Sequence, residues 1–119
     1  MLLIKLDINL KLFLFYIYNN MYEIKQYSYD KINELNEKIG KPVYFIKPSI
    51  DKKIRIYKFQ KLIADVGDKN SSDYPSYIES DGLEVANKRR TAFYSRFARL
   101  PNIKDDELTP MFWVRYLLW

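Results

Sequence analysis

Residues 53–59, KIRIYKF, alternate aliphatic side chains with polar or aromatic ones. This is the period of two that a half-buried β-strand requires. The isoleucines fall on one face of the predicted strand, and Arg55 and Tyr57 fall on the other. Short apolar segments on either side, 42–49 and 62–68, are separated from it by turn-forming residues. The pattern therefore predicts a three-stranded antiparallel sheet in which neighbouring strands are joined by short turns.

A short amphipathic helix is predicted before the sheet, over residues 27–39, because its apolar side chains recur at helical spacing. Ser28 or Asp30 is a candidate N-cap. Gly40 is suited to end the helix, since glycine readily adopts the left-handed conformation of a C-cap.

A long helix is predicted after the sheet. Residues 67–82 are rich in turn formers and are expected to be a loop with at most one helical turn at 74–78. Asp81 and Glu84 have the spacing of a capping box, which favours a helix from there to about Leu100.

Charged and apolar side chains are segregated on this long helix. The apolar stripe, which we expect to pack against the sheet, consists of Leu83, Ala86, Phe93, Phe97 and Leu100. The cations beside it are Lys88, Arg89, Arg96 and Arg99. They suit a phosphate backbone, the acidic residues of a protein neighbour, or plain solvation. Arg90 falls inside the apolar stripe, so we expect it to be structural and to pair with Asp65, Asp73 or backbone carbonyls.

The last eleven residues, TPMFWVRYLLW, contain one charge and two tryptophans, Trp113 and Trp119. Burial of such a segment is favoured by roughly 25 cal/mol per Å² of apolar area. We expect it to complete the core of the domain, and insertion into a partner is the alternative. These elements together predict an α+β domain over residues 21–119: a small three-stranded antiparallel sheet packed against a long C-terminal helix, with a short helix before the sheet and an apolar C-terminal tail.

Residues 1–20 are predicted to be an accessory apolar arm. The alternation of Leu6, Ile8 and Leu10 suggests a strand, and the segment is suited to dock on a neighbouring protein. The uncharged run 12–18 is far shorter than the ~20 residues of a membrane span, so no membrane span is expected. A start at Met21, with an upstream extension before it, is the other interpretation.

The chain of 119 residues has no cysteine and no histidine. It therefore lacks thiolate nucleophiles, imidazole bases and the ligands of ordinary zinc sites, and we expect no enzyme, no cofactor and no metal site. The acidic residues considered for a magnesium site are better explained as solvated turns; they are Asp65, Asp68, Asp73, Asp105 and Asp106.

The net charge of +5 is concentrated in one region, because residues 41–61 carry seven cations and one acid. Such a patch can attract phosphates or an acidic protein surface, and an ordinary solvated strand face is the alternative. The candidate binding residues here are Lys52, Lys53, Arg55 and Lys58. Strand alternation places Arg55 on one face of the strand and Lys52 and Lys58 on the other, so the positive charge is divided between two faces.

Three short motifs resemble a small uncharacterised domain family of nucleocytoplasmic large DNA viruses, the iridovirus-like and giant viruses, over about residues 41–119. The first is a DYP-x-Y element at Asp73, Tyr74, Pro75 and Tyr77. The second is a KRR helix motif at Lys88, Arg89, Arg90 and Arg96. The third is a closing LW pair at Leu118 and Trp119.

The chain departs from the family pattern at two points. Phe93 and Tyr94 share the place of the helix aromatic, and Phe97 stands where a histidine is common in the family. The second departure favours a structural role for this position. The resemblance implies a minor capsid-type or internal virion protein that binds capsid or scaffold proteins in the virion, after assembly in the host cytoplasm or nucleus. Nucleic-acid binding through the basic sheet and helix faces is the alternative.

Overall fold

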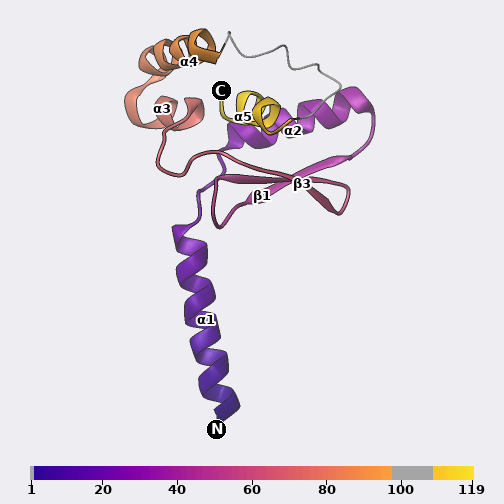
Figure 1. Cartoon of the computed structure of the whole chain (residues 1–119), viewed down its shortest axis with the longest axis vertical. Helices are drawn as coiled ribbons and strands as arrows, with labels where there is room; N and C mark the ends of the chain where they lie inside the picture. The colour runs from indigo at the N-terminus through magenta and orange to yellow at the C-terminus, as the bar shows by residue number, and fades with distance from the viewer. Residues whose placement is uncertain (1, 98–108) are drawn as a thin grey trace.

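The computed structural model describes the backbone of residues 2–97 and 109–119, and side chains from residue 8 onward. Three antiparallel strands, β1 (Tyr44–Pro48), β2 (Ile54–Lys58) and β3 (Lys61–Val66), form a sheet in the order β1-β2-β3. The predicted α+β class and the three-stranded meander are confirmed (Figure 1).

Strand alternation divides the two faces of the sheet as predicted. Ile54 and Ile56 on β2 are fully buried, whereas Arg55 and Tyr57 lie on the opposite, partly exposed face. Two helices cover the buried face: α2 (Gln26–Ile39) and α5 (Pro110–Leu118).

The core lies between this helical layer and the sheet, and Trp113 of α5 is fully buried in it. Its ring packs edge-on against Tyr44 of β1 at 5.2 Å between centroids. Leu117 and Leu118 are also buried. The apolar tail therefore completes the core, which is the expected arrangement.

The helix before the sheet is confirmed, and Gly40 ends it with φ of 90°. Its predicted N-cap is wrong. The helix begins at Gln26, and Lys25 occupies the cap position without a capping side chain. Ser28 is instead buried and donates a 2.6 Å hydrogen bond to the carbonyl of Leu117, so it ties α2 to α5.

The segment predicted as a loop contains a full helix, α3 (Tyr74–Asp81). Asp73 caps it by accepting a hydrogen bond from the backbone N–H of Ser76, and Pro75 occupies its first turn. The sequence suggested that Asp81 caps the long helix. This is wrong, because Asp81 is the last residue of α3. Gly82 separates the two helices with φ of 89°.

The long helix α4 (Leu83–Phe97) lies on the helical side of the sheet and packs against α3 (Figure 1). Ala86 and Phe93 of the predicted stripe are buried, and Phe97 is half-buried. Leu83 is 57% exposed, so its assignment to the core is wrong. The helix packs against α3 and, through Phe93, against Trp119 at the end of α5. Residues Arg99, Leu100, Asp105 and Asp106 lie outside the described residues.

The N-terminal segment forms a helix, α1 (Leu2–Asn20), so the predicted strand is wrong. The leucines that supplied a brief alternation are good helix formers, and helical spacing prevails over the longer segment. The helix extends away from the body on the side of the sheet opposite α2 and α5 (Figure 1). Asn19 and Asn20 donate side-chain hydrogen bonds to the carbonyls of Phe15 and Tyr16, at its C-terminal end.

Candidate functional site

The most unusual surface of the protein is α1. Eight of its large apolar and aromatic side chains are between 51 and 73% exposed; they are Ile8, Leu10, Leu12, Phe13, Leu14, Phe15, Tyr16 and Tyr18. At 100° per residue, these positions surround the helix and form no single stripe. A soluble protein rarely exposes so continuous an apolar surface unless the surface binds something.

Among the described residues, none of the helices combines the length and the hydropathy that crossing a membrane requires.

A buried polar cluster lies where the chain passes from α1 into the body. The hydroxyl of Tyr22, two residues after the helix, donates a 2.9 Å hydrogen bond to Asp73 Oδ2. The same oxygen lies 2.6 Å from the Lys53 ammonium, which also donates to the carbonyl of Ser71. The ammonium stands 5.0 Å from the centre of the Tyr22 ring. Burial and the negative charge of Asp73 raise the pKa of the Tyr22 hydroxyl above its ordinary value.

This cluster corrects the assignment of Lys53. We expected Lys53 on a basic surface, but its side chain is only 4% exposed and is neutralised by Asp73. The reason is long-range: α3 brings its capping aspartate to the start of β2, which the local alternation cannot predict.

The other cations of the sheet do not form one face. Lys52 and Lys58 are exposed at the two ends of β2, and Arg55 lies beside Asp65 on the outer face with 3.7 Å between Nε and Oδ2. On the same face, the ammonium of Lys47 lies over the ring of Tyr57.

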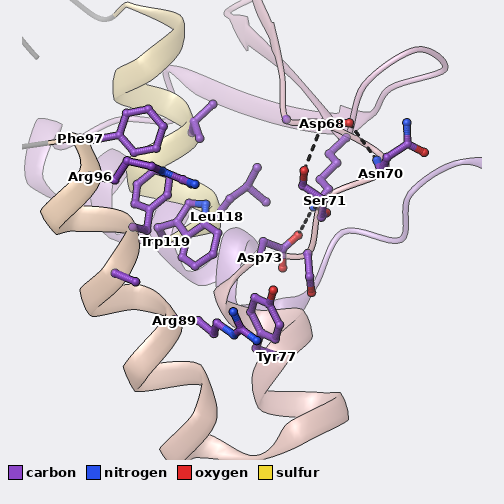
Figure 2. Close-up of a pocket in the computed structure, with 16 residues that line it drawn as sticks. Asp68, Asn70, Ser71, Asp73, Tyr77, Arg89, Arg96, Phe97, Leu118 and Trp119 are labelled. Carbon is purple, nitrogen blue, oxygen red and sulfur yellow. Dashed lines mark hydrogen bonds and ion pairs between the residues drawn. The ribbon is translucent and has the colours of Figure 1, made fainter.

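The cations predicted beside the apolar stripe of α4 also lie in different surroundings. Lys88 is exposed and lies 3.8 Å from Glu84, one turn back along the helix. Arg89 and Arg96, which are two turns apart, line one cavity of about 660 Å³ (Figure 2). Arg99 falls outside the described residues.

The cavity lies between α4, the 67–73 loop and the end of α5. Its apolar floor includes Phe93 and Trp119, whose rings are stacked at 4.5 Å with 6° between their planes. Tyr77 of α3 also lines the cavity, and the Arg89 guanidinium lies 5.5 Å from its ring centre. Asp68, in the loop, also lines the cavity, and its carboxylate accepts hydrogen bonds from Asn70 and Ser71 of the same loop (Figure 2).

Arg90 has partners other than those expected. Its guanidinium lies 4.8 Å from the centre of the Tyr74 ring and 5.7 Å from that of Tyr94. The two predicted acidic partners are engaged elsewhere, Asp65 with Arg55 and Asp73 with Lys53. The rings of Tyr74 and Tyr94 thus form a site for the Arg90 cation, which the pattern of charges along the helix did not indicate.

The described residues contain no group of three or more acidic side chains that could hold a metal ion. Of the acidic residues considered earlier, Asp65 lies beside Arg55, Asp73 is buried against Lys53, and Asp68 folds back on its own loop.

Searches of protein-family models, of curated proteins and of solved structures each find no match to this chain.

Proposed function

We propose that this chain is a structural interaction protein that attaches to a neighbouring protein through α1. The observation that carries the proposal is the apolar surface around the whole of this helix, from Ile8 to Tyr18. Burying one large apolar side chain contributes roughly 1.5–3 kcal/mol, so covering several of them supplies enough free energy for stable binding.

The distribution of these side chains indicates the shape of the binding site. Leu10 and Leu14 lie about 160° around the helix from Leu12 and Tyr16. A flat partner surface would cover one pair and leave the other exposed. We therefore infer that the partner encloses α1, in a deep groove or within a bundle of helices.

A polypeptide surface suits α1 better than a bilayer interface. A helix that lies in the plane of a membrane has a charged face opposite its apolar face. The segment 12–18 has apolar or aromatic side chains on all sides and no charge. Docking in protein also agrees with the bond of Tyr22 to Asp73, because it fixes the point at which the arm leaves the body.

The resemblance to the viral domain family suggests the setting. In a virion, the neighbours would be capsid or scaffold proteins, and the body of this chain would be held beside the protein that receives α1. Nucleic-acid binding, the alternative, has less support, since Lys53 is buried and the remaining candidate cations are dispersed.

The proposal can be tested by sedimentation of the chain with capsid or scaffold proteins purified from the native particle. Two double variants place charges on opposite sides of α1: Leu10→Glu with Leu14→Glu, and Leu12→Glu with Tyr16→Glu. We expect each to abolish co-sedimentation, because an enclosed helix tolerates charge on neither side. Circular dichroism checks that the body remains folded.

The matched control carries two glutamates at exposed apolar positions of the body, Ile39→Glu with Ile50→Glu, which are 42 and 44% exposed. It should co-sediment like the unmodified chain. Equal binding by all three variants would contradict the proposal. Loss in only one α1 variant would contradict the enclosed site.

A further inference from the structure

The cavity beside α4 combines three chemical surfaces. Arg89 and Arg96 extend into it from one helix (Figure 2). Each guanidinium lies near an aromatic ring, 5.5 Å from the centre of Tyr77 and 5.0 Å from that of Phe97. Among the described residues, neither arginine has an acidic partner within ion-pair distance, although both are exposed.

The opposite rim of the cavity carries a negative charge. Asp68 accepts hydrogen bonds from the backbone N–H of Asn70 at 2.9 Å and from the hydroxyl of Ser71 at 3.0 Å. These bonds hold the pKa of the Asp68 carboxyl below its ordinary value, so it is ionised at neutral pH. Asp73, deeper in the cavity wall, is neutralised by Lys53.

The floor between these rims is apolar. Phe93, Leu118 and Trp119 contribute to it, and the Trp119 ring lies between Phe93 and Tyr77, with centroid distances of 4.5 and 6.2 Å. Because the Phe93 and Trp119 rings are stacked on each other, the faces that they share are closed to a nucleic-acid base.

We propose that this cavity binds an acidic peptide segment of a protein neighbour, with carboxylates on the two arginines and an apolar side chain on the floor. Guanidinium groups bind carboxylates with two parallel hydrogen bonds. The backbone N–H groups of an extended peptide can donate to Asp68, which a polyanion without such donors cannot do. A nucleic acid carries a charge at every nucleotide, so a phosphate would lie near Asp68, whereas a peptide can place an uncharged residue there; this difference favours peptide over nucleic acid.

This inference extends the proposed function, since it gives the same kind of protein neighbour a second attachment point on the body. It does not require α1. The experiment therefore uses the full chain with α1 unchanged, and the peptide site and the arm can fail independently.

The probe is a blocked hexapeptide with two glutamates on each side of a Leu-Phe pair, titrated while nitrogen–proton NMR signals are followed. We expect shifts of the Trp119 indole and of the Arg89 and Arg96 side-chain signals. Replacing the glutamates of the peptide by glutamine should weaken binding by at least tenfold. This comparison needs no variant of the protein.

Two variants of the protein locate the site. Arg89→Gln and Arg96→Gln should each weaken binding about tenfold, because each removes a charge-assisted pair of hydrogen bonds. Lys88→Gln, one residue away but directed elsewhere on α4, should bind the peptide like the unmodified chain. All three positions are exposed, so the fold should be retained, which the NMR spectrum itself reports.

The inference is overturned if the peptide shifts none of these signals at millimolar concentration, or if the glutamine peptide binds equally well. It is also overturned if Lys88→Gln weakens binding as much as Arg89→Gln does. A six-nucleotide oligothymidylate that binds more tightly than the peptide, at the same signals, would assign the site to nucleic acid instead.

Discussion

The ammonium of Lys53 lies 2.6 Å from Asp73 Oδ2, with the two side chains 4 and 1% exposed. This ion pair joins the start of β2 to the cap of α3. Through the hydroxyl of Tyr22 it also fixes the chain that leaves α1. The point at which the arm leaves the body and the start of α3 are therefore held by the same buried cluster.

Asp73→Ala should lower the free energy of unfolding by about 3–5 kcal/mol, because it leaves Lys53 as a buried, uncompensated charge. Adding Lys53→Met should recover part of this loss, since the charge is then removed. Urea unfolding measures both effects. Asp68→Ala, in the same loop but exposed, serves as the control and should lower the free energy of unfolding much less. If the double variant loses as much free energy of unfolding as Asp73→Ala and Lys53→Met lose together as single variants, the pair is not coupled.

The stability of the protein should fall as the pH rises above about 10. Burial and the charge of Asp73 raise the pKa of Tyr22, and burial raises those of Tyr27 and Tyr116. The unfolded chain then releases these protons near pH 10 while the folded chain keeps them, so the stabilisation is complete below pH 10 and is lost above it.

For this pH dependence, Tyr22→Phe should make the decline shallower by up to about 1.4 kcal/mol per pH unit, measured by urea unfolding at pH 9, 10 and 11. Tyr16→Phe, on the exposed surface of α1, is the matched control and should leave the slope unchanged. A slope that is the same in Tyr22→Phe and in the unmodified chain would contradict the assigned shift.

Arg90→Gln should destabilise the protein by about 1–2 kcal/mol, because the guanidinium loses its half-buried contacts with Tyr74 and Tyr94. Lys88→Gln, two residues earlier on the exposed side of α4, should change stability by less than about 0.5 kcal/mol. Thermal melting of the two variants gives the comparison. Equal melting temperatures would show that the cation contributes nothing at this position.

Gly67→Ala should be more destabilising than Gly40→Ala. Both glycines have positive φ, 93° and 90°, so both substitutions pay a similar backbone cost of about 1–2 kcal/mol. Only at Gly67 would the added Cβ meet neighbours, with Leu118 Cδ1 and Lys53 Cβ each 2.9 Å away. We expect an additional 1–3 kcal/mol, approximately, at Gly67 from this overlap. Denaturant midpoints that coincide for the two variants would contradict the close packing.

Those elements that local sequence determines were predictable. The period of two in β2, the helical spacing before Gly40 and the buried Ala86 and Phe93 of α4 each depend on residues within one element. The apolar tail was also predictable, because burial is the common fate of a segment such as the one around Trp113.

The remainder depends on contacts between distant segments. Lys53 is placed in the interior by Asp73, twenty residues later, and the alternation of β2 gives no sign of this. Arg89 and Arg96 share a cavity only because α5 returns Trp119 to the side of α4. The helical form of residues 2–20 was not predicted, because the alternation of Leu6, Ile8 and Leu10 suggests a strand, whereas the many leucines of the whole segment favour a helix.

The central claim, that α1 is enclosed by a neighbouring protein, is tested most directly by photo-crosslinking within the native assembly. A benzophenone amino acid is placed at Phe13, Phe15 or Tyr16, which point in different directions around the helix. We predict that all three positions crosslink to peptides of the same protein neighbour. Crosslinks from one position alone, or to none of the surrounding proteins, would contradict the claim.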